Sequence, residues 1–212
     1  MIALLLLALL AAGPDGSELQ ALVAPLTAAR TDGRLGQVAG SAGLEPQTGQ
    51  GPPIPIAGVS LVVLPRSPAL LRDLEDVKAK ARESEAAYFG AVAAVAGVRE
   101  RYEQALREVG AGDLIFSGTS DARGDYLFAR VPAGEWLLIA RSESVRRLPA
   151  RGPSRRERER FVLRPKSLGY RDVTYWVTPV TVVAGDTVRI VLSDRNPWLR
   201  GVAEERKAPE GR

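Results

Sequence analysis

The chain has 212 residues and a net charge of +4, and it contains neither histidine nor cysteine. These absences exclude disulfide bonds, thiol nucleophiles, a lipid anchor on an N-terminal cysteine and the catalytic triads that need an imidazole base. Hydrophobic residues make up 45% and charged residues 25% of the chain, a balance typical of a globular domain. The length suggests one domain with extensions, or one and a half domains. We therefore expect a protein that is not an enzyme and that holds no metal or cofactor.

The chain begins with an apolar segment. Residues 2–12 are eleven apolar side chains in a row, fewer than the roughly 20 that cross a bilayer. Ala11, Ala12 and Gly13 supply the small residues found at the cleavage site of a secretory signal peptide. We expect residues 1–13 to be a signal peptide and the mature protein to be periplasmic or secreted; the alternative is a buried N-terminal helix.

An N-terminal extension over residues 14–34 leads into the first strands. Within it we expect a short helix that is interrupted at Pro25. Residues 35–42 predict a weak strand, and after a loop rich in glycine and proline, residues 56–65 predict a buried strand rich in β-branched side chains. These two strands form the first part of a β-sandwich, over residues 35–66.

The spacing of the apolar residues changes in the next segment, residues 67–111. Apolar side chains recur there at intervals of three and four, which predicts helix. One continuous helix over residues 69–109 would be about 60 Å long, at 1.5 Å per residue, and would not return the chain to the sandwich. We therefore expect a helical hairpin with arms of equal length, bent near residue 89 at Gly90, or alternatively at Gly97. The hairpin is either an interaction arm or a cover for one sheet face.

Strands return after the hairpin and form the second part of the sandwich, over residues 112–200. Alternating or β-branched runs separated by turn residues predict five strands, over residues 113–120, 125–131, 135–142, 173–184 and 187–193. With the two earlier strands this makes seven, a number that favours an antiparallel β-sandwich. A basic loop over residues 143–169 interrupts this part, and residues 201–212 are polar and expected to be disordered.

Four segments of the chain resemble carboxypeptidase regulatory-like domains. Residues 56–65 (IAGVSLVVLP) resemble the second strand of that family, and residues 119–128 (TSDARGDYLF) resemble its T-x-D-x-x-G-x-Y/F-x-F run. Residues 131–138 (VPAGEWLL) resemble the L-P-x-G-x-Y-x-L run that follows, and residues 181–192 resemble the last hairpin. The resemblance implies a prealbumin-like (transthyretin-like) sandwich and a non-catalytic accessory module. The expected fold is therefore mainly β, a seven-stranded antiparallel prealbumin-like β-sandwich that carries an inserted helical hairpin, which the resemblance does not explain.

One hairpin turn has its own local chemistry. The Asp121 side chain is placed to cap the turn backbone, and Gly124 permits a tight hairpin. Tyr126 and Phe128 lie two residues apart, so they share a face of the strand and are expected in the core. The alternative for Asp121 and Asp125 is a calcium site completed by backbone carbonyls.

The positive charge of the chain is concentrated in one segment. Residues 141–172 hold eleven basic and four acidic residues, a net charge of +7, so the remaining residues carry about −3, the difference between +4 and +7. Arginine binds phosphates and carboxylates through paired hydrogen bonds, so this segment predicts polyanion binding, with candidates at Arg155, Arg156, Arg158 and Arg160. In an exported protein the polyanion would be an anionic membrane surface or an acidic glycan and not a nucleic acid. The alternative is a solvated loop with internal Arg–Glu pairs.

Aromatic residues near the end of the chain are candidates for a ligand platform. Tyr175, Trp176 and Trp198, together with Arg200, are able to stack on sugars and to hydrogen-bond to them; the alternative is packing in the core. We expect a non-catalytic exported module that mediates protein or cell-envelope interactions, with an envelope protein or a glycan as its partner. The alternative function is that of a carbohydrate-binding module of the starch-binding-like fold.

Overall fold

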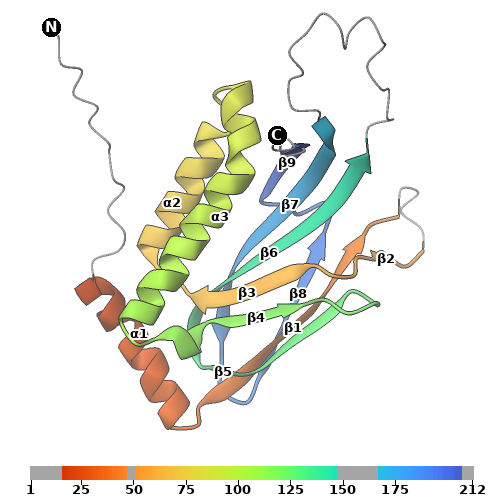
Figure 1. The fold of residues 1–212 in the computed structure, drawn as a ribbon. Helices are drawn as coiled ribbons and strands as arrows, with labels where there is room; N and C mark the ends of the chain where they lie inside the picture. Colours follow the sequence, from red (N-terminus) through yellow and green to blue (C-terminus); the bar gives the residue numbers. More distant parts are fainter. Residues whose placement is uncertain (1–15, 47–50, 148–166, 207–212) are drawn as a thin grey trace, which may run out of the picture.

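The computed structural model describes residues 16–46, 51–147 and 167–206. Within these residues the protein is mainly antiparallel β-structure, arranged in two sheets with three α-helices beside them (Figure 1). Nine strands are present in this part of the chain, one at each of the seven predicted positions and two more. The predicted signal peptide lies outside the described residues, and no helix among them is long and apolar enough to span a membrane.

The four-stranded sheet is built around β1 (Leu35–Leu44). β1 pairs with β5 (Asp125–Pro132) in the antiparallel direction and with β8 (Thr187–Ser193) in the parallel direction, and its end pairs with β2 (Ile54–Pro55). The parallel pair corrects the prediction of a wholly antiparallel sandwich. The strand before β8 in the chain belongs to the other sheet, and the turn at Gly185 carries the chain across. A hairpin would require an antiparallel pair, but β8 forms no hairpin and is able to pair with β1 in the parallel direction.

The five-stranded sheet has the order β4-β3-β6-β7-β9, and neighbouring strands are antiparallel. Its members are β4 (Phe116–Thr119), β3 (Ser60–Pro65), β6 (Gly134–Arg147), β7 (Ser167–Val182) and β9 (Leu199–Arg206). The presence of β9 corrects the prediction of disorder from residue 201. The sequence predicts a basic loop over residues 143–169, but β6 extends to Arg147 and β7 begins at Ser167. The residues of β9 have little intrinsic strand preference, so their pairing with β7 determines the structure.

Both faces of the five-stranded sheet are buried along β3 and the first part of β6. Residues 61–65 of β3 and 136–140 of β6 are buried without interruption, whereas a sheet with one solvent-exposed face would alternate. One face packs against the four-stranded sheet, and Trp176 Nε1 donates to a backbone carbonyl of β8 at 2.8 Å. Tyr126 and Phe128 of β5 lie in this core, as predicted.

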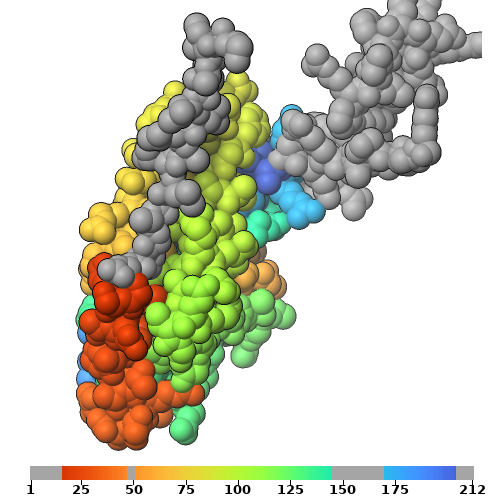
Figure 2. All heavy atoms as spheres, turned by 60° about the vertical axis from the view of Figure 1, so that its left-hand side comes forward, coloured from red at the N-terminus to blue at the C-terminus, as the bar shows by residue number. Residues whose placement is uncertain are grey.

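The other face is covered by a helical hairpin, formed by α2 (Pro68–Lys80) and α3 (Glu85–Glu108). The Tyr175 hydroxyl of β7 donates to the Val92 carbonyl of α3 at 3.3 Å. Helix α3 also approaches β9 so closely that a Cβ atom on Gly201 would lie 2.7 Å from Val92 Cγ2. The hairpin therefore packs on the sandwich and is not a projecting arm, and Figure 2 shows the helices as one surface over this side of the molecule.

The hairpin bends at residues 81–84. Ser84 caps α3, because its Oγ accepts a hydrogen bond from the backbone N–H of Ala87 at 3.1 Å. The predicted bend at Gly90 or Gly97 is wrong, since both glycines lie inside α3. The arms contain 13 and 24 residues, so the assumption of equal arms also fails, and the capping residue sets the start of the second arm.

An N-terminal helix, α1 (Gly16–Thr31), occupies the predicted extension. It runs through Pro25 without interruption, which corrects the prediction of a break. Pro25 is exposed, and the buried face of the helix holds it in place despite the lost backbone N–H. That face includes Leu26, which packs so tightly on the start of β6 that a Cβ atom on Gly134 would lie 2.3 Å from Leu26 Cδ2. Helix α1 therefore belongs to the folded body.

Candidate functional site

The predicted aromatic platform is not formed, because two of its rings lie in the core. Tyr175 is 3% and Trp176 is 2% exposed. The two residues are neighbours on β7, so their side chains point to opposite faces of the sheet. The Tyr175 hydroxyl donates to the Val92 carbonyl of α3, and Trp176 Nε1 donates to the Ser193 carbonyl of β8. Both faces are covered, so neither ring offers an exposed surface for stacking.

The other two candidates lie at the start of β9. Trp198 is half-buried against α2, where its Nε1 donates to Glu75 Oε1 at 2.8 Å and Lys78 Nζ lies over the ring, 5.1 Å from its centroid. Arg200 is exposed and donates to the Asp194 carbonyl. The four predicted residues therefore do not converge on one platform. Four further candidates, proposed for polyanion binding, lie outside the described residues: Arg155, Arg156, Arg158 and Arg160.

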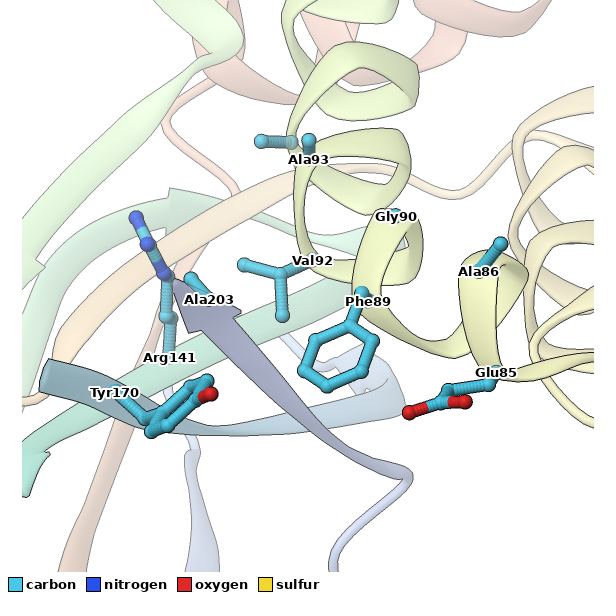
Figure 3. Close-up of a pocket in the computed structure, with 10 residues that line it drawn as sticks. Glu85, Ala86, Phe89, Gly90, Val92, Ala93, Arg141, Tyr170 and Ala203 are labelled. Atoms are coloured by element: carbon cyan, nitrogen blue, oxygen red, sulfur yellow. The ribbon is translucent and has the colours of Figure 1, made fainter. Parts of the chain in front are cut away.

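A cleft lies between α3 and the strands β6, β7 and β9, and we call it the helix-side cleft (Figure 3). Its volume is about 860 Å³. Ligand sites in proteins are typically about 300–1,000 Å³, so the cleft is large enough for a small ligand. One helix and three strands supply its lining, namely Glu85, Ala86, Phe89, Gly90, Val92, Ala93 and Ala96 of α3 with Arg141, Tyr170 and Ala203.

Two aromatic rings belong to the wall of the helix-side cleft. Phe89 is 41% exposed, so part of its side chain is accessible to a ligand. Its ring centroid lies 6.4 Å from that of Tyr170, with 34° between the ring planes. The neighbouring positions of α3 carry small side chains or none, at Ala86, Gly90 and Ala93, so they leave the cleft open beside the Phe89 ring.

Arg141 supplies a cation to the same cleft. It forms an ion pair with Glu143 through one Nη, and Glu143 also pairs with Arg171 at 3.4 Å. The Nε of Arg141 is buried and has no hydrogen-bond partner among the described residues. Buried donors are normally hydrogen-bonded to protein or to water. The guanidinium lies over the ring of Tyr175, 5.9 Å from the centroid. Burial raises the pKa of Tyr175 despite this nearby positive charge, so Tyr175 is a neutral hydroxyl donor.

A second groove lies beside the same strands, and we call it the sheet-side groove. Its volume is about 470 Å³. Trp176 and Arg200 both line it, so the structure brings two of the four predicted ligand residues to one place. Trp176 is only 2% exposed there, so its ring is not available for stacking on a ligand. Ser142, Ser144 and Thr174 also line this groove, and their positions are not marked by any sequence motif.

The turn at Asp121 is capped by its own side chain, as predicted. Asp121 Oδ1 accepts hydrogen bonds from the backbone N–H groups of Asp125 at 2.9 Å and Arg123 at 2.8 Å. These bonds favour the charged form and lower the pKa of Asp121. Within the described part of the chain, no group of three or more acidic side chains is placed to hold a metal ion.

The fold and its cavities define a two-sheet β-protein with a helical cover and ligand-sized openings beside one set of strands. No protein-family model matches the chain, and no curated protein matches its sequence. A solved structure that matches is that of a Pseudomonas aeruginosa protein for which carbohydrate binding has been suggested. It is 12% identical, with 75% of this chain and 88% of that chain covered and a TM-score of 0.38. A likeness at this level does not establish a common fold, so the function is inferred from the cavities themselves.

Proposed function

We propose that this protein is a non-catalytic binding module that holds an amphipathic anion in the helix-side cleft. Such a ligand has an apolar or aromatic body and one acidic group. The observation that carries the proposal is that an exposed Phe89 ring and the cationic Arg141 side chain line one ligand-sized cavity. Apolar walls with a few convergent polar groups are the usual composition of small-molecule sites.

The two parts of the ligand meet different walls of the cleft. The apolar body lies against Phe89, Tyr170 and the methyl groups of the α3 alanines, where each Å² of buried apolar surface contributes about 25 cal/mol. The acidic group lies at Arg141, and a hydrogen bond between two charged partners contributes about 1.5–3 kcal/mol. Glu143 engages one Nη of Arg141, so the acidic group of the ligand meets the remainder of the guanidinium that lines the cleft.

The proposal includes a periplasmic or secreted location and a relationship to carboxypeptidase regulatory-like domains. The apolar run over residues 2–12 supports export. The capped turn at Asp121, followed by Tyr126 and Phe128 in the core, supports the family resemblance. In the envelope an amphipathic anion is available as a lipid fragment or as an apolar protein segment that ends in a carboxylate, and both present the same chemistry to the cleft.

Fluorescence of anilinonaphthalene sulfonate, an aromatic anion with the proposed chemistry, tests the site. The wild-type protein is expected to bind this probe saturably. Phe89→Ala and Arg141→Gln are each expected to weaken binding about tenfold, which corresponds to about 1.4 kcal/mol. Leu127→Ala is the matched control, because Leu127 is 60% exposed on the other sheet. Binding that Phe89→Ala leaves unchanged, or an equal loss in Leu127→Ala, would refute the proposal.

Displacement of the bound probe then distinguishes the two sources of ligand. Decanoate represents a lipid fragment, and a short peptide with a C-terminal leucine and a free carboxylate represents a protein segment. The competitor that displaces the probe from the wild-type protein, and loses affinity in Phe89→Ala, identifies the class of ligand.

A further inference from the structure

We propose that the sheet-side groove is a separate binding site and that it takes a neutral carbohydrate. The groove lies where β6, β7 and β9 run past the end of the four-stranded sheet (Figure 1). Trp176 contacts Ser193, the last residue of β8, so the residues of β7 that precede Trp176 extend beyond that strand. The volume of about 470 Å³ falls within the range of small-molecule sites.

The floor of the groove carries a row of hydroxyl groups. Ser142 is paired with Thr174, and Ser144 is paired with Asp172, so these side chains share the sheet face that also holds Trp176. Neighbours across two strands on one face are about 5 Å apart. Within the described residues, the hydroxyls of Ser142, Ser144 and Thr174 have no hydrogen-bond partner in the protein, although Ser142 and Thr174 are half-buried. Because half-buried hydroxyls are normally hydrogen-bonded, this row favours a ligand that is itself rich in hydroxyl groups.

One arginine and three carboxylates border the row of hydroxyls, namely Arg200 with Glu143, Asp172 and Asp194. Arg200 is paired with Thr174, and its hydrogen bond to the Asp194 carbonyl engages one of the five N–H donors of a guanidinium. Asp172 adds carboxylate oxygens to the same lining. An anionic ligand would be opposed by these carboxylates and a cationic ligand by Arg200. The hydroxyls of a neutral polyol are able to donate to carboxylates and to accept from a guanidinium. The carboxylates therefore disfavour an anionic ligand, and the row of hydroxyls favours a neutral polyol.

Apolar groups complete the groove. Tyr88 of α3 and Ile56 line it, together with Leu44, which is 43% exposed. A pyranose ring has hydroxyls around its edge and C–H groups on its faces, so it fits a cavity with a hydroxyl floor and an aromatic or aliphatic wall. Tyr88 and Phe89 are adjacent on α3, with their ring centroids 5.9 Å apart. Tyr88 lines the sheet-side groove and Phe89 the helix-side cleft, so the two sites are neighbours with different chemistry.

Calorimetric titration with neutral trisaccharides tests this site, using maltotriose, cellotriose, chitotriose and mannotriose as the probes. The wild-type protein is expected to bind at least one of them. Thr174→Val keeps the β-branched shape and removes the hydroxyl, so it is expected to weaken that binding about fivefold, and Ser142→Ala is expected to do the same. Thr119→Val is the matched control with no expected effect, because Thr119 is exposed on the edge strand β4.

Two results would overturn this inference. One is the absence of binding by every trisaccharide at millimolar concentration. The other is binding that Thr174→Val and Ser142→Ala leave unchanged, which would place the sugar elsewhere. The inference is independent of the proposed function, and the two fail separately: Phe89→Ala is expected to retain sugar binding, and Thr174→Val is expected to retain anilinonaphthalene sulfonate binding.

Discussion

The close contact between β9 and α3 makes the position of the helical hairpin testable. An alanine in place of Gly201 would bring its Cβ to 2.7 Å from Val92 Cγ2, well inside the ordinary carbon–carbon contact of about 3.5–4.0 Å. Val92 is buried, and a β-branched side chain in a helix has one strongly preferred rotamer, so it cannot turn aside. Overpacking of this kind costs about 1–3 kcal/mol. Gly201→Ala is therefore expected to lower the free energy of unfolding by about 2 kcal/mol.

Val92→Ala is the matching change on the helix. Alone it removes two buried carbon groups, at about 0.8 kcal/mol each, and is expected to lower the free energy of unfolding by about 1.5 kcal/mol. In the double variant the added methyl at Gly201 meets no clash and fills part of the space. The combined loss is therefore expected to be smaller than the sum of the single losses by about 1 kcal/mol or more.

Urea unfolding, followed by tryptophan fluorescence and far-ultraviolet circular dichroism, measures all four proteins of this cycle. If the free energy of unfolding falls with urea concentration at the same slope in all four proteins, their unfolded states are comparable. Additive losses would contradict a direct contact between Gly201 and Val92. A Gly201→Ala variant as stable as the wild type would show that β9 does not rest on α3 at this residue.

Two further predictions concern the bend of the hairpin and the turn at Asp121. Ser84 caps α3, whereas Gly90 is an exposed residue inside the helix with open space around it. In urea unfolding, Ser84→Ala is expected to lower the free energy of unfolding by about 1 kcal/mol, and Gly90→Ala is expected to raise it by about 0.5–1 kcal/mol. A bend of the hairpin at Gly90 would reverse the second result. Hydrogen bonds lower the folded-state pKa of Asp121, so its contribution to stability is present above the unfolded pKa of about 3.9 and is lost as the pH falls through the lower folded value. Asp121→Asn is therefore expected to melt below the wild type at neutral pH, and the two melting temperatures are expected to converge as the pH falls through the folded-state pKa of Asp121. A difference that does not decrease in acid would contradict this assignment.

The strands could be predicted where residue patterns are local. Local residue patterns predict the positions of seven of the nine strands in the described residues, although not all of their bounds. Asp121 caps its turn by accepting hydrogen bonds from residues two and four positions later. The sequence of β9, LRGVAEER, has no such alternation, and long-range pairing with β7 makes it a strand. The parallel pairing of β1 with β8 is likewise a property of the sheet order, which no local pattern encodes.

The candidate sites could be predicted only in part, because side-chain exposure depends on what covers each face of a strand. Tyr175 and Trp176 are aromatic neighbours on one strand, and a sheet with one open face would expose one of them. The unbroken apolar runs at residues 61–65 and 136–140 are the sequence signal that this sheet is covered on both faces. Phe89, on the other hand, joins Arg141 and Tyr170 only through the packing of α3 on the strands.

Both cavities arise from the unequal lengths of the strands. β6 and β7 contain 14 and 16 residues, whereas β1 and β8 contain 10 and 7. At about 3.4 Å per residue β7 spans roughly 54 Å and β8 roughly 24 Å, so the four-stranded sheet cannot cover the whole of one face. On the other face, the 24 residues of α3 reach about 36 Å at 1.5 Å per residue.

The uncovered ends of β6 and β7 must therefore carry side chains that are compatible with water, unlike the apolar residues in the middle of the same strands. On one face this requirement is met by the hydroxyls of Ser142 and Thr174, and on the other by the ion pairs that join Arg141, Glu143 and Arg171. Helix α3 converts the second of these faces into a cleft, because its capped start at Ser84 places Phe89 beside Tyr170. Helix α3 therefore has two roles: residues of its C-terminal half, such as Tyr102 and Leu106, complete the core, and its N-terminal half forms one wall of the helix-side cleft.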